Sequence, residues 1–225
     1  MTNPTDALSA TEFTPEDIAS LDTLLSNSHP LMVEAFYLAA IPKWYDINLL
    51  KTLRNKDDGR EQGLVTRLNR YSFVSSLHLQ SGDTRGYSVR AEERDLLQRR
   101  WIKEDPEAYK AAHQRALIFW GIHPDPNPFA HAQNCLYHQF FVDYAASVRD
   151  LIVLFRTYAN DRQFTAIEHL LNVAKEAGTY VTLLDVELTA GIDDLLTYLK
   201  ARLAQLRGQW AKSRDLLNGL EISSG

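Results

Sequence analysis

The chain has 225 residues, with 24 basic and 29 acidic side chains, and its formal net charge is −5. Hydrophobic residues make up 45% and charged residues 24%, a balance that is typical of a folded globular protein and excludes a disordered or fibrous chain. The longest apolar stretches fall well short of the roughly 18 residues that a membrane helix needs, which excludes an integral membrane protein.

A single cysteine, Cys135, excludes an internal disulfide and favours a reducing compartment. The first residues lack the basic and apolar regions of a secretory signal, so we expect a cytoplasmic protein. Residues 1–30 hold five acidic side chains and no lysine or arginine. No segment has the strong basic excess that most nucleic-acid binders show.

Residues 1–29 are expected to form an acidic arm with one helix, which begins at Thr14 and Pro15 because these residues suit an N-cap and a first helical position. Residues 30–104 are predicted to form a winged-helix domain. Three helix patterns come first, the second of them capped by Asp46. A β-hairpin and a connecting helix follow, at 73–79, 87–89 and 91–103, with turn residues between the two strands.

Residues 105–225 are predicted to form an antiparallel helical bundle with tetratricopeptide-like hairpins, so the expected fold class is mainly α. Gly208, Trp210 and Ser213 have the spacing of a tetratricopeptide-repeat turn. We expect Trp210 to pack on the preceding helix and Ser213 to let two helices approach closely. The apolar residues after Ser213 would lie at the uncovered end of the stack, which makes this hairpin a candidate for self-association.

Five short motifs occur in the order and spacing that they have in one protein family. They are a junction with leucine, proline, aromatic residues and aspartate at 38–46, the hairpin entry at 68–74, the exit strand and helix at 87–94, a His-x-x-Ala at 113–116 and a Leu-Tyr-His at 136–138. Over about 190 residues, the chain thereby resembles the winged-helix and helical-repeat region of STAND-type signalling ATPases.

In that family a P-loop domain binds nucleotide, and the resemblance implies a regulatory role beside such a domain. The chain itself has no G-x-x-x-x-G-K-[ST] loop to cradle phosphates. Many relatives place a histidine that can contact the β-phosphate of ADP where this chain has Arg90, which is therefore a candidate vestigial nucleotide-sensing residue. We expect a non-catalytic chain without a cofactor, whose partner is a P-loop ATPase or the rest of a larger parent protein.

His131, Cys135 and His138 are the candidate metal ligands. Their i, i+4, i+7 spacing places them on one helical face, and zinc accepts such ligands, with His123 or a carboxylate as the fourth. The apolar residues around them favour a buried helix instead. Cys135 also lacks a readable oxyanion hole for nucleophilic catalysis. We therefore expect neither a metal site nor a catalytic cysteine.

Arg60, Arg67 and Arg70 lie on or near the third helix of the predicted winged helix, and Arg85 lies in the wing. A DNA-binding winged helix makes its phosphate and base contacts there. The basic excess around these residues is small, and Glu61 stands among them. The sequence thus favours a regulatory protein-interaction module, with a DNA-binding transcriptional regulator as the alternative.

Overall fold

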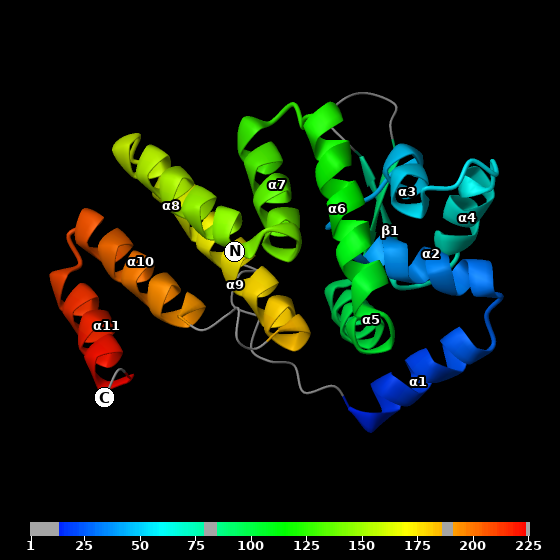
Figure 1. The fold of residues 1–225 in the computed structure, drawn as a ribbon, viewed down its shortest axis with the longest axis horizontal. Coiled ribbons are helices and arrows are strands. Elements are labelled where there is room, and N and C mark those ends of the chain that lie inside the picture. The colour runs from blue at the N-terminus through cyan, green and yellow to red at the C-terminus, as the bar shows by residue number, and fades with distance from the viewer. Residues whose placement is uncertain (1–13, 79–84, 186–190, 224–225) are drawn as a thin grey trace. The chain divides into compact units, whose positions relative to one another are not determined.

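The computed structural model describes residues 14–78, 85–185 and 191–223. Within these ranges the chain is mainly helical, with eleven α-helices and one two-stranded antiparallel sheet, which confirms the predicted fold class at this level (Figure 1). It divides into two compact units, which we call unit 1 (residues 1–104) and unit 2 (residues 105–225). The first part of the predicted acidic arm and most of the predicted hairpin tip lie outside the described residues.

Unit 1 is built around α2. Its elements are α1 (Pro15–Ser26), α2 (Pro30–Ala40), α3 (Ile47–Arg54), α4 (Glu61–Leu68), β1 (Val74–His78), β2 (Arg85–Val89) and α5 (Ala91–Glu104). α2 is buried on most sides, as its apolar sequence predicts, and it contacts α3, α4, α5 and β2. Phe36 of α2 packs edge-on against Tyr71, with ring centroids 4.9 Å apart. One apolar helix thus organises the core of this unit.

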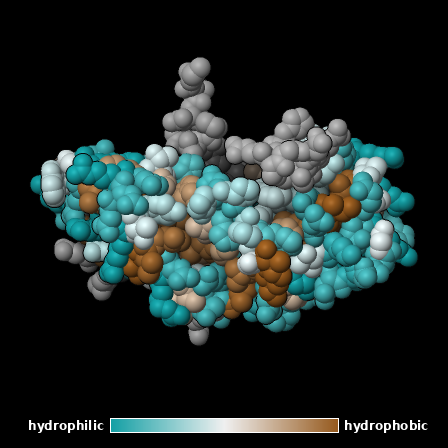
Figure 2. All heavy atoms as spheres, turned by 90° about the horizontal axis from the view of Figure 1, so that it is seen from above, coloured by the Kyte–Doolittle hydropathy of each residue, from teal (hydrophilic) through white to brown (hydrophobic). Residues whose placement is uncertain are grey.

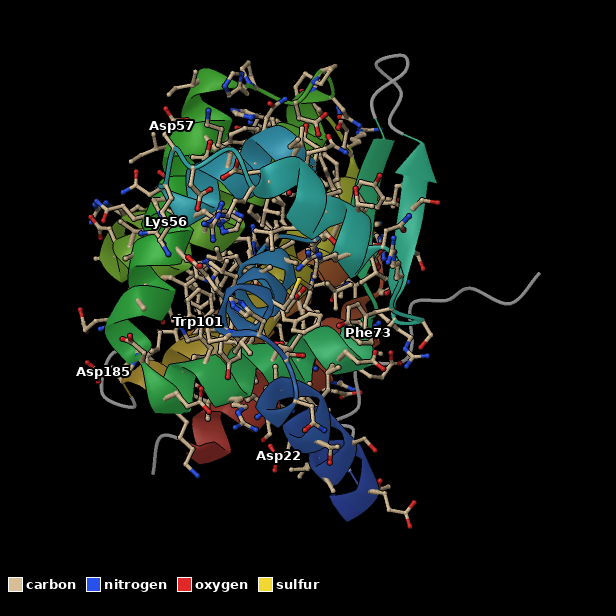
Figure 3. The ribbon with its side chains drawn as sticks, turned by 90° about the vertical axis from the view of Figure 1, so that its right-hand side faces the viewer. Asp22, Lys56, Asp57, Phe73, Trp101 and Asp185 are labelled. Carbon is tan, nitrogen blue, oxygen red and sulfur yellow. The ribbon has the colours of Figure 1, made fainter. Side chains whose placement is uncertain are left out.

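α5 packs against α2 through a pair of stacked rings. The centroids of Tyr37 and Trp101 lie 5.3 Å apart, and Trp101 is labelled in Figure 3. The Tyr37 hydroxyl donates a hydrogen bond of 2.6 Å to Glu104 at the end of α5. Tyr37 is thus fixed at both its ring face and its hydroxyl, which sets the position of α5 on α2.

The segment between α2 and α3 joins the hairpin as a single-residue strand. Tyr45 and Tyr87 exchange two backbone hydrogen bonds of 2.8 Å, so Tyr45 forms an isolated bridge to β2. The next residue, Asp46, accepts a hydrogen bond of 2.8 Å from the Leu49 N–H and caps α3, as predicted. Tyr45 is fully buried. The sequence analysis did not identify this bridge, because one paired residue has no periodic signature.

A buried arginine connects α3 to α4. Arg54, at the end of α3, is only 3% exposed. Its two terminal nitrogens donate hydrogen bonds of 2.7 and 2.8 Å to Asp58, and one of them also donates to Glu61 at 2.5 Å. The guanidinium beside Asp58 holds the pKa of that carboxyl well below its usual range. We call Arg54, Asp58 and Glu61 the arginine clamp.

The turn inside the clamp also carries two exposed ion pairs, at Lys56 and Asp57 (Figure 3). The Lys56 ammonium lies 2.7 Å from Glu34 of α2, and the Lys51 ammonium lies 3.0 Å from Asp57. Exposed pairs of this kind contribute little to stability. The direction in which α4 leaves the turn therefore depends mainly on the buried clamp.

Unit 2 is a series of antiparallel helices. They are α6 (Pro106–Ile122), α7 (Pro128–Val142), α8 (Tyr144–Asn160), α9 (Phe164–Leu184), α10 (Ile192–Leu206) and α11 (Trp210–Ser223). Asp105, Asn127 and Asp143 cap α6, α7 and α8 through side-chain oxygens that accept backbone N–H groups. Each helix from α6 to α11 contacts the next one in the chain, and α7 also packs against α9.

Of the three residues that the sequence analysis singled out in the α10–α11 hairpin, two have the environment expected of them and one does not. Gly208 has a φ of 74°, a left-handed conformation that favours glycine, and Ser213 is 2% exposed where the helices meet. The prediction that Trp210 packs on α10 is wrong, because its side chain is 68% exposed. Trp210 is the first residue of α11, and Leu206, the last of α10, is itself 44% exposed. Self-association through this hairpin stays a prediction.

Replacing Arg54 tests the clamp. Arg54→Ala leaves the Glu61 carboxylate buried without its partner, so we expect the free energy of unfolding to fall by about 3–5 kcal/mol in urea melts. Arg60→Ala, which removes an exposed pair with Asp58 at 3.7 Å, should cost less than about 1 kcal/mol. The double variant Arg54→Ala/Glu61→Ala should recover part of the loss. Equally small losses for Arg54→Ala and Arg60→Ala would contradict the clamp.

Ser213 should tolerate a smaller side chain and reject a larger one. Its hydroxyl is buried without a hydrogen-bond partner among the described residues. Ser213→Ala should therefore raise the unfolding free energy by up to about 1 kcal/mol, and Ser213→Leu should lower it by about 1–3 kcal/mol through overpacking. Ala211→Leu, at an exposed position of the same helix, is the control and should stay within about 0.5 kcal/mol. A Ser213→Leu variant as stable as this control would show that the helices do not meet there.

Candidate functional sites

The exposed side of α4 is polar and basic. We call its exposed residues, on and beside the helix, the α4 face: Arg60, Gln62, Gly63, Thr66, Arg67, Asn69 and Arg70. They occupy one half of the helix, and the buried Leu64, Val65 and Leu68 occupy the other. The structure therefore places the three predicted arginines of this helix on one surface.

The place of Glu61 in the sequence suggests that it lies among these arginines at the surface, but in the structure it does not. It is 4% exposed and takes part in the arginine clamp. Among the described residues, Arg67 and Arg70 have no ion-pair partner, and Arg60 shares Asp58 with Arg54. Arg67 and Arg70 are thus the positive charges of the α4 face that are not balanced by an ion pair among the described residues.

The other two predicted arginine positions lie on and after β2. Arg85 is the first residue of β2 and is paired with His78 of β1 in the sheet register. Arg90 follows the strand and is exposed. Its guanidinium forms ion pairs with Glu93 and, at 3.8 Å, with Glu92. A phosphate at Arg90 would have to displace these carboxylates, so this position gains no support as a nucleotide sensor.

The three candidate metal ligands on α7 separate into two environments. The Cys135 sulfur lies 3.6 Å from Nε2 of His131, and both side chains are partly exposed. His138 is buried and turns toward α6 instead. In the described part of the chain, no three His, Cys, Asp or Glu side chains come together as a metal site. Their spacing along α7 does not bring the three side chains together, because His138 contacts His113 in the core.

That partner is His113 of α6. The two Nδ1 atoms lie 3.0 Å apart, and both rings are at most 1% exposed. One nitrogen must donate and the other accept, so each ring has a defined tautomer. Tyr109, Tyr137 and Phe141 surround the pair. The His-x-x-Ala and Leu-Tyr-His motifs thus meet in the core, where packing between α6 and α7 accounts for both histidines.

Apolar side chains are exposed mainly on unit 2. Of nine large apolar residues that are exposed in the described ranges, one, Ile18, lies in unit 1. The other eight are Ile118, Ile122, Val142, Val153, Leu183, Tyr198, Leu206 and Trp210. Figure 2 shows apolar patches among hydrophilic residues on one face of the molecule. Sequence reasoning missed Ile118 and Ile122, because the pattern of α6 reads as apolar on several sides.

The Cys135 thiol should react slowly with alkylating reagents. Burial raises its pKa, so the nucleophilic thiolate is scarce near neutral pH. At pH 7.5, iodoacetamide should modify Cys135 more slowly than it modifies free glutathione, as followed by mass spectrometry. The difference should disappear in denaturing urea, and His131→Ala should leave the native rate unchanged. A native rate above that of glutathione, and lost in His131→Ala, would instead indicate an activated Cys–His pair.

Comparison with known proteins gives no relative for this chain: no protein-family model, curated protein or solved structure matches it. None of the helices in the described residues combines the length and apolar character that a membrane span requires.

Proposed function

We propose that this protein is a non-catalytic regulatory module that binds a protein partner through unit 2, with unit 1 as a winged helix. The observation that carries the proposal is a pair of exposed isoleucines on α6. Ile118 and Ile122 are one helical turn apart and are 53% and 68% exposed. Apolar side chains that neighbour each other at a surface are typical of interaction sites.

The α6 surface has the composition of a small docking site. Gln114 and Gly121 are exposed beside the two isoleucines at i, i+4, i+7 and i+8 spacing, so the four residues share one stripe of the helix. A Cβ at Gly121 would meet no atom within 4 Å, so no packing inside the described chain accounts for a glycine there. The glycine leaves room for a partner to approach the helix backbone.

The order of elements in unit 1 supports the winged-helix assignment. A helix, a short strand at Tyr45, two helices and a hairpin follow each other, and the strand at Tyr45 pairs with β2. The packing of successive helices in unit 2, the contact of α7 with α9 and the left-handed Gly208 turn support tetratricopeptide-like hairpins. The order of these two parts is also the order in the STAND-type ATPases that the sequence resembles. A P-loop ATPase is therefore the partner class that we propose.

Proximity labelling in the native host tests this function. A chain fused to a labelling enzyme should enrich a protein that carries a Walker A motif in its own sequence. Ile118→Lys/Ile122→Lys should lose that enrichment, because two lysines cannot enter an apolar contact. Val153→Lys, at a 58% exposed position of α8, is the matched control and should keep it.

All three proteins should have the same melting temperature, since the replaced side chains are exposed. An enriched set that is identical for the α6 variant and the wild type would overturn the role of α6. A set without any P-loop protein would overturn the partner class.

A further inference from the structure

The α4 face has the charge, shape and composition of a surface for duplex nucleic acid. We propose that it binds a double helix, with Arg60, Arg67 and Arg70 at the phosphates and α4 in the major groove. This site lies in unit 1 and does not depend on the protein contact proposed for unit 2.

The charge of the α4 face follows from the arginine clamp. With Glu61 turned inward to Arg54, the carboxylate that pairs with an arginine of this face is the partly exposed Asp58, 3.7 Å from Arg60. Arg67 and Arg70 are free of ion pairs within the described residues, so binding a phosphate does not first require a salt bridge to break. The chain as a whole is acidic, at −5. The positive charge of the α4 face is therefore a local feature of an acidic protein.

Gly63 gives the face its shape. A Cβ at this position would meet no atom within 4 Å, and φ is not in the left-handed region, so neither packing nor backbone geometry requires glycine. Glycine in a helix interior is destabilising by roughly 0.5–1 kcal/mol relative to alanine. A major groove about 12 Å wide accepts a helix, and the missing side chain lets a groove wall come closer to the backbone.

The polar residues of the face suit base edges. Gln62 and Asn69 carry amides that donate and accept hydrogen bonds, and Thr66 adds a hydroxyl and a methyl group. Thr66 bonds to the Gln62 carbonyl at 2.7 Å, which leaves its methyl for apolar contact. Glutamine and asparagine pair with adenine, and threonine methyl groups contact thymine.

The residue composition of the α4 face favours nucleic acid, rather than an acidic protein, as its ligand. None of the exposed large apolar residues of the described chain lies on α4. Protein interfaces have an apolar, aromatic-rich centre, whereas nucleic-acid interfaces are polar and positively charged. An acidic protein would find no apolar centre on this face.

Fluorescence anisotropy with the full chain tests the proposal. The probe is a labelled mixed-sequence duplex of about 20 base pairs, titrated at several salt concentrations from about 50 to 200 mM. Arg67→Ala/Arg70→Ala should weaken binding at low salt by about tenfold and reduce the slope of log K against log salt by about two. Gly63→Leu keeps every charge but fills the groove side of the helix, and it should also weaken binding.

The matched control is Arg149→Ala/Arg156→Ala, which removes two exposed arginines of α8 in unit 2. It should leave both affinity and salt slope unchanged. Circular dichroism should show all variants folded. The proposal is overturned if the wild-type chain does not bind the duplex at low salt, or if the α4 and α8 variants lose affinity equally. It is also overturned if polyglutamate competes as well as unlabelled duplex, because the face would then bind any acidic chain.

Discussion

The buried guanidinium of Arg54 is the interaction on which the surface of unit 1 depends. It holds Asp58 at the turn and Glu61 at the start of α4, so it fixes where α4 begins and which side faces out. A buried charge without partners is strongly destabilising, so the three residues are stable only together. The same arrangement withdraws a carboxylate from the surface. A structural interaction thereby sets the electrostatics of the α4 face.

Local signals in the sequence predicted much of the fold, but they did not reveal the pairings between residues far apart in the chain. Asp46 before an apolar helix, and Pro106 after Asp105, each specify a helix start within a few residues, because capping is a local interaction. The bridge between Tyr45 and Tyr87 joins residues far apart in the chain and leaves no period to detect. The arginine clamp was missed for a related reason, since charged residues in a turn are usually solvated.

For the candidate sites too, the sequence indicated where residues lie along a helix but not which partners surround their side chains. The sequence predicted Arg67 and Arg70 on or near the third helix of the winged helix, and in the structure both are exposed, on and just after α4. Spacing alone could not show that Glu61 turns inward, or that His138 meets His113 from another helix. In both cases the side chain contacts a partner inside the fold and therefore does not join the residues next to it in the sequence. The sequence alone therefore does not show which charged residues or metal-ligand candidates share one face of a helix.

Large apolar residues are exposed mainly on unit 2 in the described ranges. Eight of the nine exposed large apolar residues in the described ranges belong to unit 2, and α4 in unit 1 exposes arginine, amide and hydroxyl groups. Gly63 and Gly121 sit within these two surfaces, and a Cβ at either would meet no atom within 4 Å. Each glycine weakens its own helix and gains nothing from internal packing. Packing among the described residues therefore does not explain why glycine stands at either position.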